Sequence, residues 1–175
     1  MNPSSTAGTA PGSPAPDAPV TVHTPRGGFR TEIRVADHRL VSDEPASLGG
    51  TGAGPTPYDL LLAGLGACTG MTLRMYADRK GWPLEDVVVR LRHGRTHEAD
   101  CENCKSPDSR LDRVEREIEL VGALDAEQRA RLLHIANQCP VHRTLATGFQ
   151  VETRLVEEGA ADQLAGPPER AIQAS

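Results

Sequence analysis

Two cysteines, Cys68 and Cys139, are the residues whose type and surroundings most clearly predict chemistry. Each lies inside a predicted helix and has small or apolar neighbours. Because the thiolate is a strong nucleophile, a pair of such cysteines predicts thiol redox chemistry. The alternative is that both sulfurs are small core side chains, which is a common role for free cysteine.

The helix around Cys68 is built from small residues, namely Gly64, Gly66, Ala67, Thr69 and Gly70. Glycine is a poor helix former, so this composition is costly unless another element approaches the helix closely. If the glycines interrupt the helix, Cys68 lies near a new helix N-terminus. The helix dipole would then raise the thiolate fraction there.

Cys139 is followed by Pro140, Val141 and His142. An imidazole three residues further along a helix can hydrogen-bond or protonate a sulfur on the same face. His142 is therefore a candidate site residue. The alternative is a surface or structural histidine without a chemical role.

The other two cysteines form a His97-x3-Cys101-x2-Cys104 pattern, with His93 four residues earlier. Cysteine pairs at this spacing are common zinc half-sites. The alternatives are a polar loop with two surface thiols, or a Cys101–Cys104 redox pair. A second cysteine pair is lacking, so we favour surface thiols and predict no bound metal.

The elements that must position these residues follow from periodicity and end signals. Residues 1–19 and 158–175 are rich in Pro, Ala, Gly and Ser and predict disordered tails around one domain, 20–157. Thr56, Pro57 and Asp59 predict a capped helix start, and Gly81 predicts its end near Lys80. The first half of this helix is apolar or small on every side, which predicts burial all round.

The remaining elements are predicted from alternation and helical spacing. They are a strand or hairpin over 29–41, a glycine-rich loop over 48–55, strands over 87–91, 114–120 and 149–156, and a helix over 126–146 capped by Asp125 and broken or kinked at Pro140. This order of helices between antiparallel strands predicts an α+β fold.

Composition excludes several classes of function. The net charge is −5 and only 3% of residues are aromatic, so neither duplex nor single-stranded nucleic acid is an expected partner. No apolar run approaches the ~20 residues of a membrane span, and the first 20 residues do not form a signal peptide. We therefore expect a cytoplasmic protein, in which cysteines are more often reactive than structural.

The segment from Gly49 to Leu62, leading into Ala67-Cys68-Thr69, resembles the first cysteine segment of OsmC-like proteins. Cys139-Pro140-Val141-His142 with Leu145 resembles the second. The resemblance covers about residues 29–155. It implies an intertwined α+β homodimer, with two central helices packed between sheets from both subunits and active sites at the dimer interface.

The resemblance to the organic hydroperoxide resistance branch of this family also implies an activity. Cys68 would attack the peroxide and become a sulfenic acid, and Cys139 would condense with it to a disulfide. An external thiol or dithiol would reduce that disulfide, with no bound cofactor. A small hydroperoxide would bind in an apolar pocket near Leu60, Leu65 and Met71 across the interface.

The family also uses a carboxylate and an arginine at the thiolate. Asp59 matches the carboxylate position, although it is one methylene shorter than the usual Glu and is also the predicted capping residue. Asp59 and Cys68 lie on opposite faces of an ideal helix, so their cooperation requires a break at Gly64 or Gly66.

Leu48 stands where the OsmC branch has its arginine. Arg30, Arg34 and Arg39 are upstream alternatives, and Arg30 is included among the predicted site residues. These departures motivate two other hypotheses. One is a non-enzymatic or weakly active redox or ligand-binding protein on the same fold, and the other is a zinc-stabilised module.

Overall fold

The computed structural model describes residues 19–96 and 111–157. The chain divides into two compact units, the first formed by the segments up to Pro55 and from Thr153 onwards and the second by Thr56–Glu152. Apart from Pro19, both predicted tails lie outside the described residues, as do His97, Cys101 and Cys104. The predictions made for those residues stay predictions.

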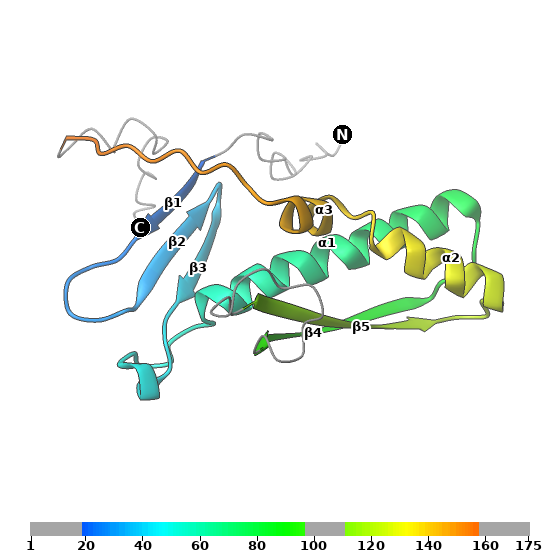
Figure 1. The fold of residues 1–175 in the computed structure, drawn as a ribbon, viewed down its shortest axis with the longest axis horizontal. Coiled ribbons are helices and arrows are strands. Elements are labelled where there is room, and N and C mark those ends of the chain that lie inside the picture. Colours follow the sequence, from blue (N-terminus) through cyan, green and yellow to red (C-terminus); the bar gives the residue numbers. More distant parts are fainter. Residues whose placement is uncertain (1–18, 97–110, 158–175) are drawn as a thin grey trace, which may run out of the picture. The chain divides into compact units, whose positions relative to one another are not determined.

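The first unit contains a three-stranded antiparallel sheet in the order β1-β2-β3 (Figure 1). Its strands are β1 (Val20–His23), β2 (Thr31–Val35) and β3 (His38–Ser42). The hairpin predicted over 29–41 is confirmed, with Val35 opposite His38 across a two-residue turn. Strand β1 was not predicted, because four residues are too few to establish an alternation.

A buried carboxylate organises the glycine-rich loop that follows β3 and the short 3-10 helix η1 (Ala46–Leu48). Asp43 accepts hydrogen bonds from the Thr51 hydroxyl at 2.6 Å and from three backbone N–H groups, those of Glu44, Thr51 and Ala53. The Thr51 hydroxyl, followed by these N–H groups, lowers the pKa of Asp43 to about 2. The loop is therefore a defined structure despite its glycines.

In the second unit, α1 (Pro57–Lys80) begins and ends as predicted. Thr56 is the N-cap, and Thr56 and Asp59 form a reciprocal capping box. At the other end Gly81 has a left-handed φ of 65° and closes the helix. The break at Gly64 or Gly66 that cooperation of Asp59 with Cys68 would require is absent, because α1 is one continuous helix.

Helix α1 packs along a two-stranded antiparallel sheet made of β4 (Asp86–Thr96) and β5 (Leu111–Val121) (Figure 1). It also contacts α2 (Ala126–Ala136) and α3 (Pro140–Thr147). The core of this unit combines α1, α2 and their connections, and its buried members are Leu73, Ala77, Leu84, Leu124, Leu132 and Ala136. The charged outer face of β5, with Glu115, Glu117 and Glu119, confirms the predicted wet face.

The predicted break at Pro140 is confirmed, because α2 ends at Ala136 and α3 starts at Pro140. The cap at Asp125 is confirmed as well, with its side chain accepting from the Gln128 backbone N–H. The strand predicted over 149–156 is wrong. These residues are described but form no strand, because no neighbouring strand pairs with their backbone groups.

The prediction that the first half of α1 is buried on every side is also wrong for the single chain, because Tyr58 and Leu61 are 45% and 42% exposed. The helix buries one stripe, which consists of Leu65, Thr69, Leu73 and Ala77. Met71 and Met75 are 66% and 72% exposed. By length and composition alone α1 is long and apolar enough to cross a membrane. In this unit, however, it is the central helix and supplies core residues.

Candidate active site

Cys139 is fully buried and caps the N-terminus of α3. Its Sγ accepts a hydrogen bond from the His142 backbone N–H at 3.3 Å. Pro140 occupies the first position of the helix, where its fixed φ fits and no N–H is needed. The proximity to a helix N-terminus that was expected for Cys68 is therefore found at Cys139.

Cys68 lies in the middle of α1 and is half-buried. It is a free thiol, like Cys139. Its neighbours at seven-residue spacing are Leu61 and Met75, both exposed, so Cys68 belongs to the uncovered stripe of α1. Cys68 is thus partly exposed in the single chain, whereas Cys139 is not.

Thr69 connects the two cysteines. It follows Cys68 on α1 and is fully buried, with its Oγ1 3.7 Å from the Cys139 Sγ. The same hydroxyl donates to the Leu65 carbonyl oxygen at 2.8 Å and accepts from Arg116 Nη1 at 2.9 Å. Cys139 therefore contacts the residue that follows Cys68 on α1.

Asp59 is held by the capping box, in which its Oδ2 accepts from the backbone N–H and the hydroxyl of Thr56 at 2.9 and 2.7 Å. These two bonds lower the pKa of Asp59, the side-chain bond most. Because α1 is unbroken, the nine-position step from Asp59 to Cys68 separates them by about half a turn around the helix axis. Asp59 and Cys68 of one chain therefore occupy opposite faces of α1.

The remaining predicted site residues are His142 and Arg30, and His142 contacts one of the two cysteines. His142 contributes its backbone N–H to the Cys139 sulfur, a contact that the sequence reasoning had assigned to its imidazole. Arg30 lies just before β2 in the other unit and forms an exposed ion pair with Glu32 at 3.0 Å. Its role at the thiolate stays a prediction.

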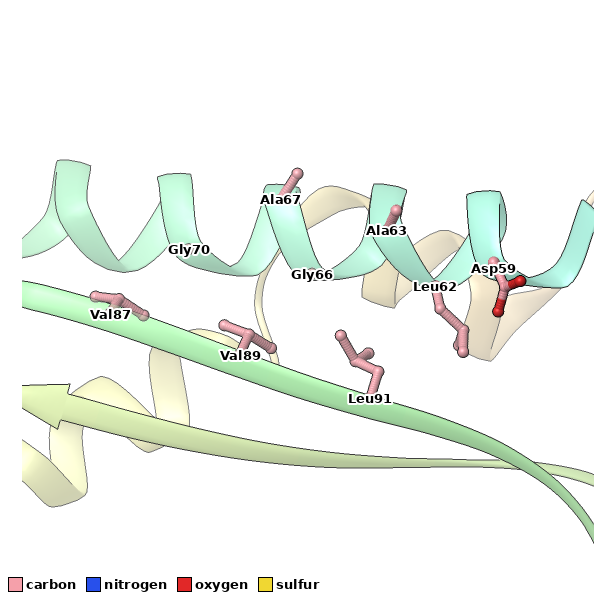
Figure 2. Close-up of a pocket in the computed structure, with 9 residues that line it drawn as sticks. All are labelled: Asp59, Leu62, Ala63, Gly66, Ala67, Gly70, Val87, Val89 and Leu91. Atoms are coloured by element: carbon pink, nitrogen blue, oxygen red, sulfur yellow. The ribbon is translucent and has the colours of Figure 1, made fainter. Parts of the chain in front are cut away.

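A groove of about 490 Å³ runs between α1 and β4 (Figure 2). Its lining is apolar except at Asp59 and consists of Asp59, Leu62, Ala63, Gly66, Ala67, Gly70, Val87, Val89 and Leu91. Gly66 allows β4 to approach closely, since a Cβ there would lie 2.9 Å from Leu91 Cδ1. Cys68 does not line this groove, and the pocket expected near Met71 requires a second subunit.

The possible zinc ligands His97, Cys101 and Cys104 lie outside the residues that the structure describes. Among residues 19–96 and 111–157, no three His, Cys, Asp or Glu residues gather as a metal site. His93 is described, and its Nε2 lies 3.0 Å from Asp112 Oδ1. Its ring stacks on Tyr58 with centroids 4.3 Å apart.

Sequence reasoning missed two residues at this site, Thr69 and Arg116. Arg116 lies on β5, and its Nη2 donates to Asn137 Oδ1 at 2.7 Å while its Nη1 also donates to the Ala136 carbonyl oxygen at 3.3 Å. One signal was available, because the alternation of β5 places Arg116 on the same face as the apolar Val114, Ile118 and Leu120. A cation among apolar residues on a covered face needs partners.

Comparisons with known proteins agree with the resemblance of the two cysteine segments. No curated protein matches the chain. Three solved structures share its fold. An OsmC-like protein from Mycoplasma pneumoniae has a TM-score of 0.60 at 18% identity, covering 74% of this chain and 87% of that one. An organic hydroperoxide resistance protein OsmC from Legionella pneumophila has a TM-score of 0.54 at 22% identity, covering 73% and 88%.

The organic hydroperoxide resistance protein OhrB of Bacillus subtilis has a TM-score of 0.51 at 23% identity, covering 72% of this chain and 89% of that one. The likeness to all three is one of fold. The family model for OsmC-like proteins matches residues 50–154, which include both helix cysteines and Asp59. The chain has an α+β architecture, and it belongs to the OsmC-like family.

Proposed function

We propose that this protein is a cytoplasmic, homodimeric thiol peroxidase that reduces small organic hydroperoxides through Cys68 and Cys139, with an external thiol or dithiol as the reductant. The observation that carries the proposal is the contrast between the two sulfurs. Cys68 is partly exposed on α1, whereas Cys139 is fully buried and contacts Thr69, the next residue of α1. An exposed attacking thiol beside a protected second thiol is the arrangement that a two-cysteine peroxidase needs.

The chemistry assigns one role to each sulfur. Cys68 attacks the terminal peroxide oxygen, the O–O bond breaks, and the products are the Cys68 sulfenic acid and an alcohol. The Cys139 thiol then forms an S–S bond to Cys68 as the S–O bond breaks. The hydroxyl leaves with the thiol proton as water.

The reductant completes the cycle. An external thiolate attacks the more accessible Cys68 sulfur and releases Cys139. The departing Cys139 sulfur is received by the His142 N–H at the start of α3, where a negative charge is stabilised. A second thiol of the reductant then frees Cys68, and the dithiol reductant ends as a disulfide.

The homodimer explains the uncovered stripe of α1. Leu61, Cys68 and Met75 recur at seven-residue spacing, with Met71 beside them, and all are at least partly exposed. A stripe with this period fits a second helix. A second copy of α1 on this stripe would place Cys68 at the interface and form an apolar pocket there.

The proposed role of Asp59 requires this dimer, and that of Arg30 requires a change of ion-pair partner. Asp59 faces away from Cys68 of its own chain, so it would serve the Cys68 of the other subunit. Arg30 would have to exchange its Glu32 partner for the thiolate or the peroxide. His142 is proposed to act mainly through its backbone N–H.

The test is stopped-flow oxidation of the reduced protein by cumene hydroperoxide, with Cys68→Ser and Cys139→Ser variants in parallel. The Cys101→Ser/Cys104→Ser double variant is the matched control, and we expect it to react like the wild type. Cys68→Ser should lose the fast reaction, and Cys139→Ser should accumulate the sulfenic acid. A wild-type rate no higher than that of free cysteine would overturn the proposal.

The second candidate is a non-enzymatic or weakly active redox or ligand-binding protein. The observation that favours it is the state of the two accessory residues, because Asp59 is occupied in the capping box and Arg30 in an ion pair. It predicts a slow peroxide reaction that does not change in Asp59→Asn. A fast Cys68-dependent reaction would exclude it.

A further inference from the structure

Arg116 connects three separate elements at the buried thiol. From β5 its guanidinium donates to the Thr69 hydroxyl on α1, to the carbonyl of Ala136 at the end of α2, and to the side chain of Asn137. Asn137 begins the three-residue junction, 137–139, that ends at Cys139. The simplest role for Arg116 is therefore a cap on the carbonyl end of α2.

The contact with Thr69 goes beyond a helix cap. A threonine hydroxyl has one proton and two lone pairs, and here the proton is donated to the Leu65 carbonyl. Arg116 occupies one side of the oxygen, so the remaining lone pair faces the Cys139 sulfur at 3.7 Å. The Cys139 S–H is then the donor in that contact, and its direction depends on the hydroxyl that Arg116 holds.

We propose that Arg116 is a positioning residue for disulfide formation, acting through Thr69 and the 137–139 junction to hold the Cys139 sulfur beside α1. This inference rests on the proposed roles of Cys68 and Cys139. The side chain of Arg116 donates hydrogen bonds to Thr69, Ala136 and Asn137 and not to Cys68. Arg116 therefore acts on the second chemical step and not on the attack of Cys68 on the peroxide.

The second step is sensitive to position for a geometric reason. The Cys139 sulfur must approach the Cys68 sulfur opposite the S–O bond that breaks, while its proton leaves with the hydroxyl as water. Cys139 is fully buried at a non-helical junction, so it meets Cys68 only if that junction stays on α1. Small displacements of a reacting group reduce rates by factors of ten or more.

The test compares three arginine variants of the full chain after one equivalent of cumene hydroperoxide. Arg116→Met keeps the length of the side chain and removes its donors, and Arg116→Lys keeps the charge and restores one donor. Arg113→Met is the matched control, because Arg113 lies on the same strand and pairs with exposed Glu115. Sulfenic acid is trapped with dimedone, and the disulfide is measured by intact mass after alkylation.

We expect Arg116→Met to slow disulfide formation about tenfold or more, with sulfenic acid formation within about twofold of wild type. Arg116→Lys should recover part of the loss, and Arg113→Met should behave as wild type. An equal slowing of both steps in Arg116→Met would show a general structural role and overturn the inference. An unchanged rate of disulfide formation would overturn it as well.

Two further measurements test the role of Arg116 if Arg116→Met does not fold or if the wild type does not react with peroxide. If Arg116→Met does not fold, Thr69→Val retains the shape of the buried side chain, and the same loss in the second step is expected there. The Cys68–Cys139 dithiol is also equilibrated with oxidised and reduced dithiothreitol. Arg116→Met should shift this equilibrium about tenfold towards the dithiol. That readout needs no peroxide, so a missing shift defeats the role of Arg116, while a missing peroxide reaction in the wild type defeats only the proposed function.

Discussion

The middle of α1 and the junction between α2 and α3 hold chemically identical side chains in opposite surroundings. At the junction, the Cys139 sulfur is fully buried and contacts the His142 N–H and the Thr69 hydroxyl. On α1, Cys68 is half-exposed within a stripe of exposed apolar residues. Burial and backbone placement therefore distinguish two thiols that their side-chain chemistry cannot.

This difference assigns the order of events in the proposed reaction. In the single chain Cys68 is partly exposed and Cys139 is fully buried, so the proposed reaction gives the first oxidation to Cys68. The junction sulfur can react only with a group that is already inside the protein. This distinction fails if the two thiols have the same reactivity, or if their loss has the same effect on stability.

The largest expected effect is in the alkylation rates of the two thiols. In the reduced Cys101→Ser/Cys104→Ser protein, iodoacetamide should modify Cys68 about a thousandfold faster than Cys139, because a buried thiol reacts only after local opening. Peptide mass spectrometry over a time course measures both rates in one sample. Comparable rates would show that the junction opens freely and that the burial of Cys139 has no protective role.

The next effect concerns the stripe around Cys68. If a second subunit covers it, Met71→Glu buries an unpaired charge and should weaken the dimer by about a hundredfold or more. Analytical ultracentrifugation over a concentration series measures the change. Leu133→Glu is the control, because Leu133 is an exposed apolar residue on α2 outside the stripe. A monomeric wild type would remove the proposed cover from Cys68.

Local signals were sufficient to predict α1. Thr56, Pro57, Asp59 and Gly81 each act on backbone groups within a few residues, and the helix ends where they predict. The break at Pro140 followed from the same kind of reasoning. The pair Cys139-Pro140 also contained an unused signal, since proline in the first helical position marks the preceding residue as the cap.

The contacts between elements could not be predicted from one sequence. Thr69 and Cys139 are 70 positions apart, and Thr69 and Arg116 are 47 apart. No periodicity connects such pairs, because they meet only when helices and strands pack. The strand predicted over 149–156 failed for a related reason. Apolar and polar residues alternate over 149–156 as in a strand. A strand also needs a neighbouring strand to pair with, and the sequence of the segment does not identify one.

A smaller effect is expected in stability. Cys139→Ala removes a buried sulfur and the cap of α3, and should reduce the free energy of unfolding by about 2 kcal/mol. Cys68→Ala removes a half-exposed sulfur from a continuous helix and should change it by less than about 0.5 kcal/mol. Urea unfolding of the reduced proteins measures both. Equal losses would mean that Cys68 is packed as tightly as Cys139.

The smallest effect concerns the start of the helix that presents Cys68. Hydrogen bonds from Thr56 lower the pKa of Asp59 in the folded protein below its ordinary value of 3.8. The carboxylate therefore stabilises the fold above about pH 4, and this contribution is lost as the pH falls further and the group protonates. Asp59→Ala should reduce the free energy of unfolding by about 1 kcal/mol at pH 7, and by less at pH 3.

Asp78→Ala is the matched control for Asp59→Ala, since Asp78 lies at the other end of α1 with only a long contact of 4.0 Å to Arg74. Urea unfolding at both pH values gives the stabilities, and stopped-flow oxidation gives the reactivity of Cys68. If Asp59 acts only as a cap, its loss lowers stability and leaves the rate unchanged. If it serves Cys68 across the dimer, the rate falls at pH 7 by more than the stability change explains. The accessible thiol would then depend on a second subunit, whereas the contacts that hold Cys139 all lie within its own chain.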